Sequence, residues 1–129
     1  MTTMSDLRLS KIHQVTLTVG DLDRAVGFYR ETLGASFLGK WDPPGLALFD
    51  FDGVRLMVSA IPGEKEAFHG VLYFWVDNIE EAHRALVGRG VAFEQEPHLI
   101  HRRDDGSEEW MGFFRDPDRN LLAIATEKR

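Results

Sequence analysis

Cysteine is absent from the 129 residues of the chain. Disulfide scaffolds, catalysis by a thiolate and zinc sites built from cysteine are therefore excluded. The chain also lacks any apolar run near the roughly 18 residues of a membrane span. Positive charge is not in excess, because 15 Lys and Arg stand against 21 Asp and Glu, a net charge of −6 with histidine neutral. This balance argues against nucleic acid or a membrane as the main partner.

The composition is that of a single compact domain. Of the residues, 43% are hydrophobic and 11% aromatic, and a chain of this length buries roughly two-thirds of the surface that it exposes when unfolded. Residues 1–10 are mostly polar, lack the pattern of a secretion signal and are predicted to be flexible. We therefore expect a soluble, cytoplasmic protein with one domain over residues 11–127.

The first half of the chain predicts a strand, a helix and three further strands. Apolar and polar residues alternate over residues 12–19, which is typical of a strand with two different faces. Asp21 follows as a helix N-cap, apolar residues then recur at helical spacing, and Gly34 is placed to end the helix. Three short runs separated by turns predict the remaining strands, over residues 35–40, 46–51 and 54–60.

The second half repeats this order with longer loops. A strand over residues 71–76 leads to a helix for which Asn78 is the predicted N-cap, and Glu81 completes a capping box. The charged run from Asp116 to Asn120 is predicted to be a structural turn. The remaining strands of this half are predicted over residues 91–96, 98–101, 109–115 and 120–126.

The two halves match most clearly where each helix begins. Val19-Gly20-Asp21-Leu22 corresponds to Val76-Asp77-Asn78-Ile79. Neither half is large enough to bury its own sheet comfortably, so the two should pack together. The predicted fold is α+β, with two paired βαβββ modules, about residues 11–61 and 69–127, that form curled mixed sheets around a central cleft.

Several short motifs carry a resemblance to a known family. They are Val19-Gly20-Asp21-Leu22-Asp23-Arg24-Ala25, Phe28-Tyr29, Leu33-Gly34, Val76-Asp77-Asn78 and Phe114-Arg115-Asp116-Pro117-Asp118-Arg119-Asn120. Together with the doubled layout, they resemble the vicinal oxygen chelate (VOC) superfamily, which includes glyoxalase I, bleomycin-resistance proteins, extradiol dioxygenases and methylmalonyl-CoA epimerase. The resemblance covers about residues 11 to 127. It implies the fold, whereas the reactions of the superfamily are too varied to imply one of them.

The resemblance also implies four positions for metal ligands. In VOC metalloenzymes one ligand lies on each of four strands, and the corresponding positions here are Gln14, Met57, Val71 and Ala123. Glutamine can coordinate a divalent cation through its carbonyl oxygen, but valine and alanine cannot, and a thioether is poorly matched to such ions. Because these sites usually need at least three protein ligands, no metal or other cofactor is expected.

Alternation along the strands predicts which side chains line the cleft. The predicted set comes from both modules and mixes polar, apolar and aromatic residues: Gln14, Thr16, Arg55, Met57, Val71, Tyr73, Trp75, His98 and Ala123. The rings of Tyr73 and Trp75 either accept a flat, partly apolar ligand or simply fill the space between the half-sheets. Gln14 either lines the cleft or faces solvent on a half-exposed strand.

Arginine and histidine side chains offer further candidates. Arg55 is suited to pair with an anionic group of a ligand, or equally to bond Asp50 or Asp52 at the neighbouring hairpin. His98 and His101 are three residues apart, which predicts opposite faces of a regular strand and therefore no chelating pair.

Two classes of function fit these residues. A binding or sequestering protein of the bleomycin-resistance type needs only an apolar cleft with a few polar anchors, and the sequence favours this class. A metal-dependent lyase, isomerase or dioxygenase of the glyoxalase I type needs a Lewis acid and a base, here with relocated ligands such as Gln14, His98 and Glu109. Metal-free catalysis by Gln14, Arg55 or His98 is a third possibility. The expected partners are a small-molecule ligand and, from the resemblance, a second copy in a homodimer, with the cleft within or between the chains.

Overall fold

The computed structural model describes residues 7–62 and 70–129, which form two modules of the same design. The first module contains β1 (Gln14–Thr18), α1 (Leu22–Gly27), a π-helical turn η2 (Phe28–Thr32), β2 (Ser36–Trp41), β3 (Leu46–Phe51) and β4 (Val54–Ser59). The second contains β5 (Val71–Trp75), α2 (Ile79–Gly88), β6 (Phe93–Arg102), β7 (Glu108–Arg115) and β8 (Leu121–Lys128). The predicted start of the second module, residue 69, lies outside the described residues.

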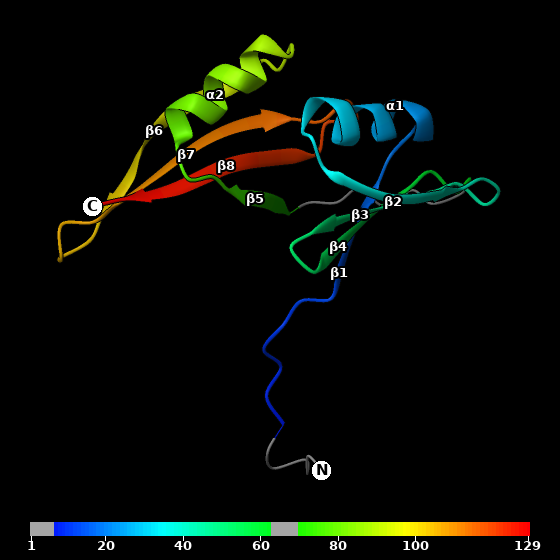
Figure 1. The fold of residues 1–129 in the computed structure, drawn as a ribbon, viewed down its shortest axis with the longest axis horizontal. Helices are drawn as coiled ribbons and strands as arrows, with labels where there is room; N and C mark the ends of the chain where they lie inside the picture. Colours follow the sequence, from blue (N-terminus) through cyan, green and yellow to red (C-terminus); the bar gives the residue numbers. More distant parts are fainter. Residues whose placement is uncertain (1–6, 63–69) are drawn as a thin grey trace.

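Each module forms one four-stranded mixed sheet. The strand orders are β1-β4-β3-β2 and β5-β8-β7-β6, so the second module repeats the topology of the first. In both, the first strand runs parallel to the last, and the other neighbouring strands are antiparallel. Figure 1 shows the two sheets side by side, with both helices on the same side and neither sheet closed into a barrel. The predicted α+β arrangement of two βαβββ modules is confirmed.

Both helices begin as the sequence predicts. The side chain of Asp21 accepts a hydrogen bond from the backbone N–H of Arg24, and that of Asn78 accepts one from the N–H of Glu81. Asp21 and Asn78 are themselves extended, with φ of −136° and −131°. These caps satisfy N–H groups that have no partner within a helix. They also fix the point at which the chain leaves the first strand of each module.

One apolar core lies between the helices and the sheets. Tyr29, Phe49 and Phe114 are among its largest fully buried side chains. The rings of Phe51 and Phe74 have centroids 5.1 Å apart and so bring the two modules into contact. Among the described residues, no helix has the length and hydrophobicity needed to cross a lipid bilayer.

β6 is a single bulged strand, where the sequence predicted two separate strands. It is the outer strand of its sheet, and its register against β7 shifts between Gln95 and His98. Pro97 lies in this shift. Proline is tolerated in an outer strand at a bulge, because its missing N–H is not needed for the ladder there.

A second bulge in β6 overturns the predicted placement of its histidines. The register also shifts between Leu99 and His101, so that Ile100 is an extra residue. His98 pairs with Met111 and His101 pairs with Glu109, two residues apart on β7. The prediction of opposite faces was therefore wrong, because a bulge resets the alternation of side chains along a strand.

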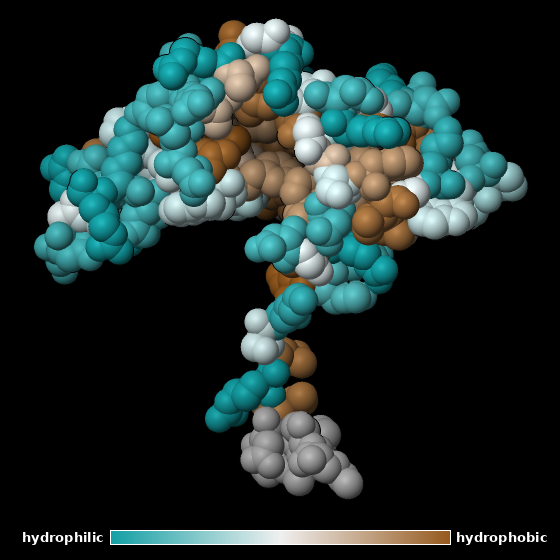
Figure 2. All heavy atoms as spheres, viewed as in Figure 1, coloured by the Kyte–Doolittle hydropathy of each residue, from teal (hydrophilic) through white to brown (hydrophobic). Residues whose placement is uncertain are grey.

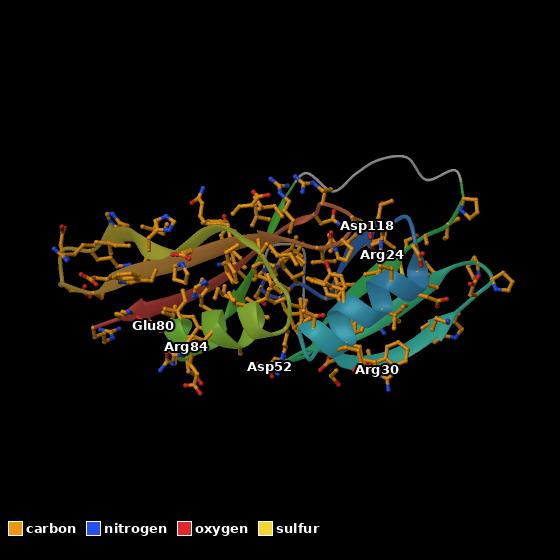
Figure 3. The ribbon with its side chains drawn as sticks, turned by 90° about the horizontal axis from the view of Figure 1, so that it is seen from above. Arg24, Arg30, Asp52, Glu80, Arg84 and Asp118 are labelled. Atoms are coloured by element: carbon orange, nitrogen blue, oxygen red, sulfur yellow. The ribbon has the colours of Figure 1, made fainter. Side chains whose placement is uncertain are left out.

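The predicted turn at residues 116–120 lies between β7 and β8 and joins the two modules. Asp116 is buried, and its Oδ2 accepts a hydrogen bond of 2.8 Å from the hydroxyl of Tyr29 in η2. The Oδ1 of Asp118 accepts bonds from the N–H of Gly20, at 2.7 Å, and from the guanidinium of Arg24, at 2.9 Å. Figure 3 shows Arg24 and Asp118 side by side at this junction. The turn therefore both reverses the chain and attaches the second module to the first.

The environment of Tyr29 keeps its hydroxyl protonated. Burial raises the pKa of Tyr29 far above its ordinary value, and the negative charge of Asp116 and the hydrogen bond to it raise the pKa further. The hydroxyl is therefore a permanent donor to Asp116 over the whole physiological range of pH.

The substitution Tyr29→Phe is expected to lower the free energy of unfolding by about 1.5–3 kcal/mol, because it removes a donor to a buried charged acceptor. The measurement is urea unfolding followed by circular dichroism. Tyr73→Phe is the matched control, since Tyr73 is exposed, and we expect it to change stability little. An equal loss in both variants would contradict the role of Tyr29.

The raised pKa of Tyr29 also predicts that the stability of the protein depends on pH. Above about pH 10 the unfolded chain loses the tyrosine proton while the folded chain keeps it, so stability falls as pH rises, by up to about 1.4 kcal/mol per pH unit. Below that pH the contribution is fully present. Urea unfolding of the parent protein and of Tyr29→Phe between about pH 8 and 11 measures this effect. The variant is expected to lack the loss of stability that Tyr29 causes. The same dependence of the free energy of unfolding on pH in both proteins would contradict the prediction.

Candidate functional site

A pocket with a volume of about 730 Å³ lies where the two modules meet. Figure 2 shows it as a hollow lined by apolar surface between the two halves of the molecule. Strands of both sheets, the β3–β4 turn and α2 contribute to its lining: Val15, Leu33, Phe51, Asp52, Val54, Arg55, Leu56, Leu72, Tyr73, Phe74, Trp75, Val76, Ala82, Ala85, Leu86, Arg89, Phe114 and Ile124.

The apolar lining follows from the pattern of the strands and from small residues in α2. Leu72 and Phe74 alternate along β5 with side chains that face the other way, and so they point toward the helix side. Ala82 and Ala85 lie on α2 next to this strand and leave space that larger side chains would occupy. Nothing in the sequence predicted the space beside Leu72 and Phe74.

Among the described residues, three with charged side chains line the pocket: Arg55, Arg89 and Asp52. The Nη2 of Arg55 lies 2.8 Å from Nε2 of His13. Because a guanidinium only donates, Nε2 of His13 is the acceptor in this contact. The sequence offered Asp50 or Asp52 as partners for Arg55, and neither aspartate lies within ion-pair distance of it in the described part of the chain.

Arg89 ties the end of α2 to the first module. Its Nη1 donates a hydrogen bond of 3.0 Å to the backbone oxygen of Thr32 in η2. Asp52 is exposed on the β3–β4 turn with φ of 51°. Sequence reasoning missed Arg89, and its only signal was a positive charge directly after Gly88, the last residue of α2.

Of the nine predicted cleft residues, three line the pocket and six lie outside its lining. Arg55, Tyr73 and Trp75 line the pocket. The other six lie on strands of the two separate sheets and are not part of its lining: Gln14, Thr16, Met57, Val71, His98 and Ala123. His98 is exposed, and its Nδ1 lies 2.8 Å from the backbone oxygen of Glu96 in its own strand.

The four positions that correspond to metal ligands do not fit a metal ion. Gln14 lies beside Met57, with 4.0 Å between Nε2 and Sδ, and its carbonyl oxygen is the one hard donor of the set. Val71 and Ala123 belong to the second sheet and have no donor atom. Among residues 7–62 and 70–129, no group of three or more His, Asp or Glu is arranged to hold a metal ion.

The relocated set considered from the sequence is also dispersed. Gln14 lies on β1 of the first sheet, whereas His98 and Glu109 lie on β6 and β7 of the second. Glu109 is already engaged, because its Oε2 accepts from the Arg103 guanidinium at 2.5 Å. These three side chains therefore do not assemble a site within one chain.

Comparison with known proteins places this geometry in a family. The sequence profile of the Glyoxalase/Bleomycin resistance protein/Dioxygenase superfamily matches residues 11–124. The chain belongs to this superfamily. Membership establishes the fold and leaves the reaction open, because one fold can host many functions.

Two curated relatives of this superfamily member illustrate that range. The chain is 28% identical over 130 residues to the uncharacterized protein YraH of Bacillus subtilis, covering 88% of this chain and 96% of the relative. It is 23% identical over 159 residues to a lactoylglutathione lyase of Schizosaccharomyces pombe, and here it spans 51% of the relative's length.

Solved structures are similar over nearly the whole chain. A lactoylglutathione lyase from Agrobacterium tumefaciens is 25% identical with a TM-score of 0.69, over 92% of this chain and 95% of that one. An integron cassette protein from Vibrio cholerae is 22% identical with a TM-score of 0.75, over 93% and 97%. The second similarity concerns the fold alone.

The donor set predicts weak metal retention. Protein loaded with Mn²⁺, Ni²⁺, Zn²⁺ or Fe²⁺ and then dialysed is expected to keep well under one ion per chain, because a single amide oxygen cannot hold an ion against water. Inductively coupled plasma mass spectrometry measures the retained metal, with Gln14→Ala as the test variant and Thr16→Ala as its neighbour control. Stoichiometric retention that Gln14→Ala abolishes would contradict the absence of a site at these positions.

Proposed function

We propose that this superfamily member binds a small, partly apolar organic ligand in the pocket between its modules, without the usual metal site. The observation that carries the proposal is the pocket itself. Its volume of about 730 Å³ falls within the range of about 300–1,000 Å³ typical of ligand sites. A mostly apolar lining with a few charged groups is also the usual composition of such sites.

Binding rather than metal catalysis is favoured by the residues at the superfamily's reactive positions. A glyoxalase-type reaction needs a Lewis acid to stabilise negative charge and a carboxylate to move a proton. Here Met57 and Ala123 occupy the positions at which such carboxylates stand. No step through a metal is therefore assigned to this chain.

A lyase, isomerase or dioxygenase reaction is the second candidate. Its support is the similarity to the two lactoylglutathione lyases, one of which matches over nearly the full length of both chains. That function would need ligands or bases from positions other than the superfamily's usual four. Arg55 is the residue of the predicted metal-free set that lines the pocket.

A ligand screen tests the proposal. Small aromatics, glycopeptides, and glutathione and CoA thioesters are screened by thermal shift, and a ligand present at about 100 times its Kd is expected to stabilise the protein by about 2.7 kcal/mol. Ala85→Trp is expected to abolish that shift by filling the pocket. Val87→Trp, on the same helix but outside the lining, is expected to preserve it. Equal shifts in both variants would place the ligand elsewhere.

We further propose that the protein is a homodimer. The support comes from large apolar side chains on the sides of the two sheets turned away from the helices. Trp41 of the first sheet is 49% exposed, and Tyr73 and Trp75 of the second are 55% and 65% exposed. Apolar surface of this kind on a small soluble protein commonly marks a contact with another chain. Such a contact could cover the pocket or leave it within each chain.

Light scattering after size-exclusion chromatography is expected to give the mass of two chains. Trp41→Ser is expected to shift the protein toward the monomer, because it removes a large ring from the proposed contact. Val87→Ser is the matched control, since Val87 is 50% exposed but lies on α2. A measured mass of one chain for the parent protein would contradict the proposed dimer.

A further inference from the structure

Four arginines lie within ion-pair distance of no carboxylate in the described part of the chain: Arg8, Arg55, Arg84 and Arg89. Most of the other described arginines and lysines lie within 4.0 Å of an acidic oxygen. Arg55 and Arg89 belong to none of these ion pairs among the described residues, and both line the pocket. Two of the four unpaired arginines therefore lie where a ligand is proposed to bind.

Arg55 also has a donor that nothing satisfies. Its Nε is buried and has no hydrogen-bond partner in the described part of the chain, although its Nη2 contacts His13. Buried donors are almost always bonded in folded proteins, and leaving one unbonded is unfavourable. A carboxylate matches a guanidinium well, because its two oxygens can accept from two of the N–H groups at once.

The remainder of the pocket suits an apolar body rather than a second polar group. Phe51 and Phe74 contribute rings, and aliphatic residues fill most of the surface between them. Aromatic rings pack well against flat groups in offset or edge-on contacts. A ligand with one charged end and a flat apolar remainder therefore matches the lining.

Asp52 is the opposing charge and does not cancel the two arginines. It is exposed on the β3–β4 turn, where water screens its field. Figure 3 shows it at the outer margin of the molecule, between the ends of the two helices. Among the described lining residues, two arginines stand against one aspartate; Arg55 is half-buried, whereas Arg89 and Asp52 are both exposed.

We propose that the ligand is an amphipathic carboxylate. Its apolar, preferably aromatic, body lies among the phenylalanines, and its carboxylate pairs with Arg55, while Arg89 adds a second positive charge. This assignment rests on the proposed function, because it presumes that the pocket is the ligand site. Beyond the proposed function, it specifies the charge of the ligand and names Arg55 as the residue that selects this charge.

The test uses three probes that differ at one group: biphenyl-4-carboxylate, biphenyl-4-carboxamide and biphenyl-4-methylamine. Isothermal titration calorimetry measures the affinity of the full chain for each. The carboxylate is expected to bind about 10- to 100-fold more tightly than the amide, which is the range of one charge-assisted hydrogen bond. The amine is expected to bind more weakly than the amide, because the arginines repel it.

Arg55→Gln is expected to remove most of the advantage of the carboxylate over the amide, because the neutral probe gains less from a positive charge. Circular dichroism reports whether the variant is folded. Arg84→Gln is the matched control, because Arg84 lies on α2 outside the lining and on the outer side of the helix in Figure 3. It is expected to change neither affinity.

Salt dependence supplies a measurement that needs no variant. Raising NaCl from about 0.05 M to about 0.5 M is expected to weaken binding of the carboxylate probe and not of the amide probe, since added ions screen charge. Equal affinities for carboxylate and amide, or tighter binding of the amine, would overturn the carboxylate assignment and leave the pocket as the ligand site. If none of the probes binds and no ligand of the wider screen is blocked by Ala85→Trp, the proposed function fails as well.

Discussion

A buried carboxylate holds the two modules together. Asp116 accepts bonds at Oδ1 from the backbone N–H groups of Asp118 and Asn120, and at Oδ2 from the side chains of Asn120 and Tyr29. Asn120 also reaches the backbone oxygen of Thr18 in β1, at 3.3 Å. The same acceptor therefore shapes a local turn and fastens it to the other module. The ion pair of Arg24 with Asp118 adds little by comparison, because half of the Arg24 side chain is exposed.

The pocket depends on this attachment, because neither module encloses it alone. Val15 and Leu56 come from the first sheet, and Leu72 and Leu86 come from the second module. The superfamily's fold is preserved while the four positions used for metal in its metalloenzymes carry one hard donor. Two arginines line the pocket at the junction of the modules, Arg55 and Arg89. The side chains at the metal positions therefore differ while the fold is the same, which is a common relation between fold and function.

The sequence predicted the features that depend on local pattern. The repeat, the caps at Asp21 and Asn78 and the turn after β7 all rest on spacings of a few residues, and the structure confirms them. The continuity of β6 was not predictable in this way. A bulge moves every later side chain to the other face, and nothing in the spacing of His98 and His101 signals the extra residue.

The site was predicted less completely, because its position depends on how two modules pack. Alternation identified Arg55, Tyr73 and Trp75, which line the pocket. It could not show that the first sheet would lie beside the second, so that the gap opens next to α2. The hydrogen bond from Arg89 to Thr32 also depends on the packing of the modules, since it joins residues 57 positions apart in sequence. The metal positions were judged from side-chain chemistry alone, which needs no knowledge of the packing.

The position of β5 at the edge of its sheet has a consequence for the behaviour of the isolated chain. Within the described strands it pairs with β8 alone, which leaves its other row of backbone amides and carbonyls unpaired. Its sequence, Val-Leu-Tyr-Phe-Trp, is uninterrupted by charge or proline. An uncovered edge of that composition is a template on which further strands can add without limit, the first step toward insoluble aggregates. A contact that covered this edge would therefore protect the solubility of the chain.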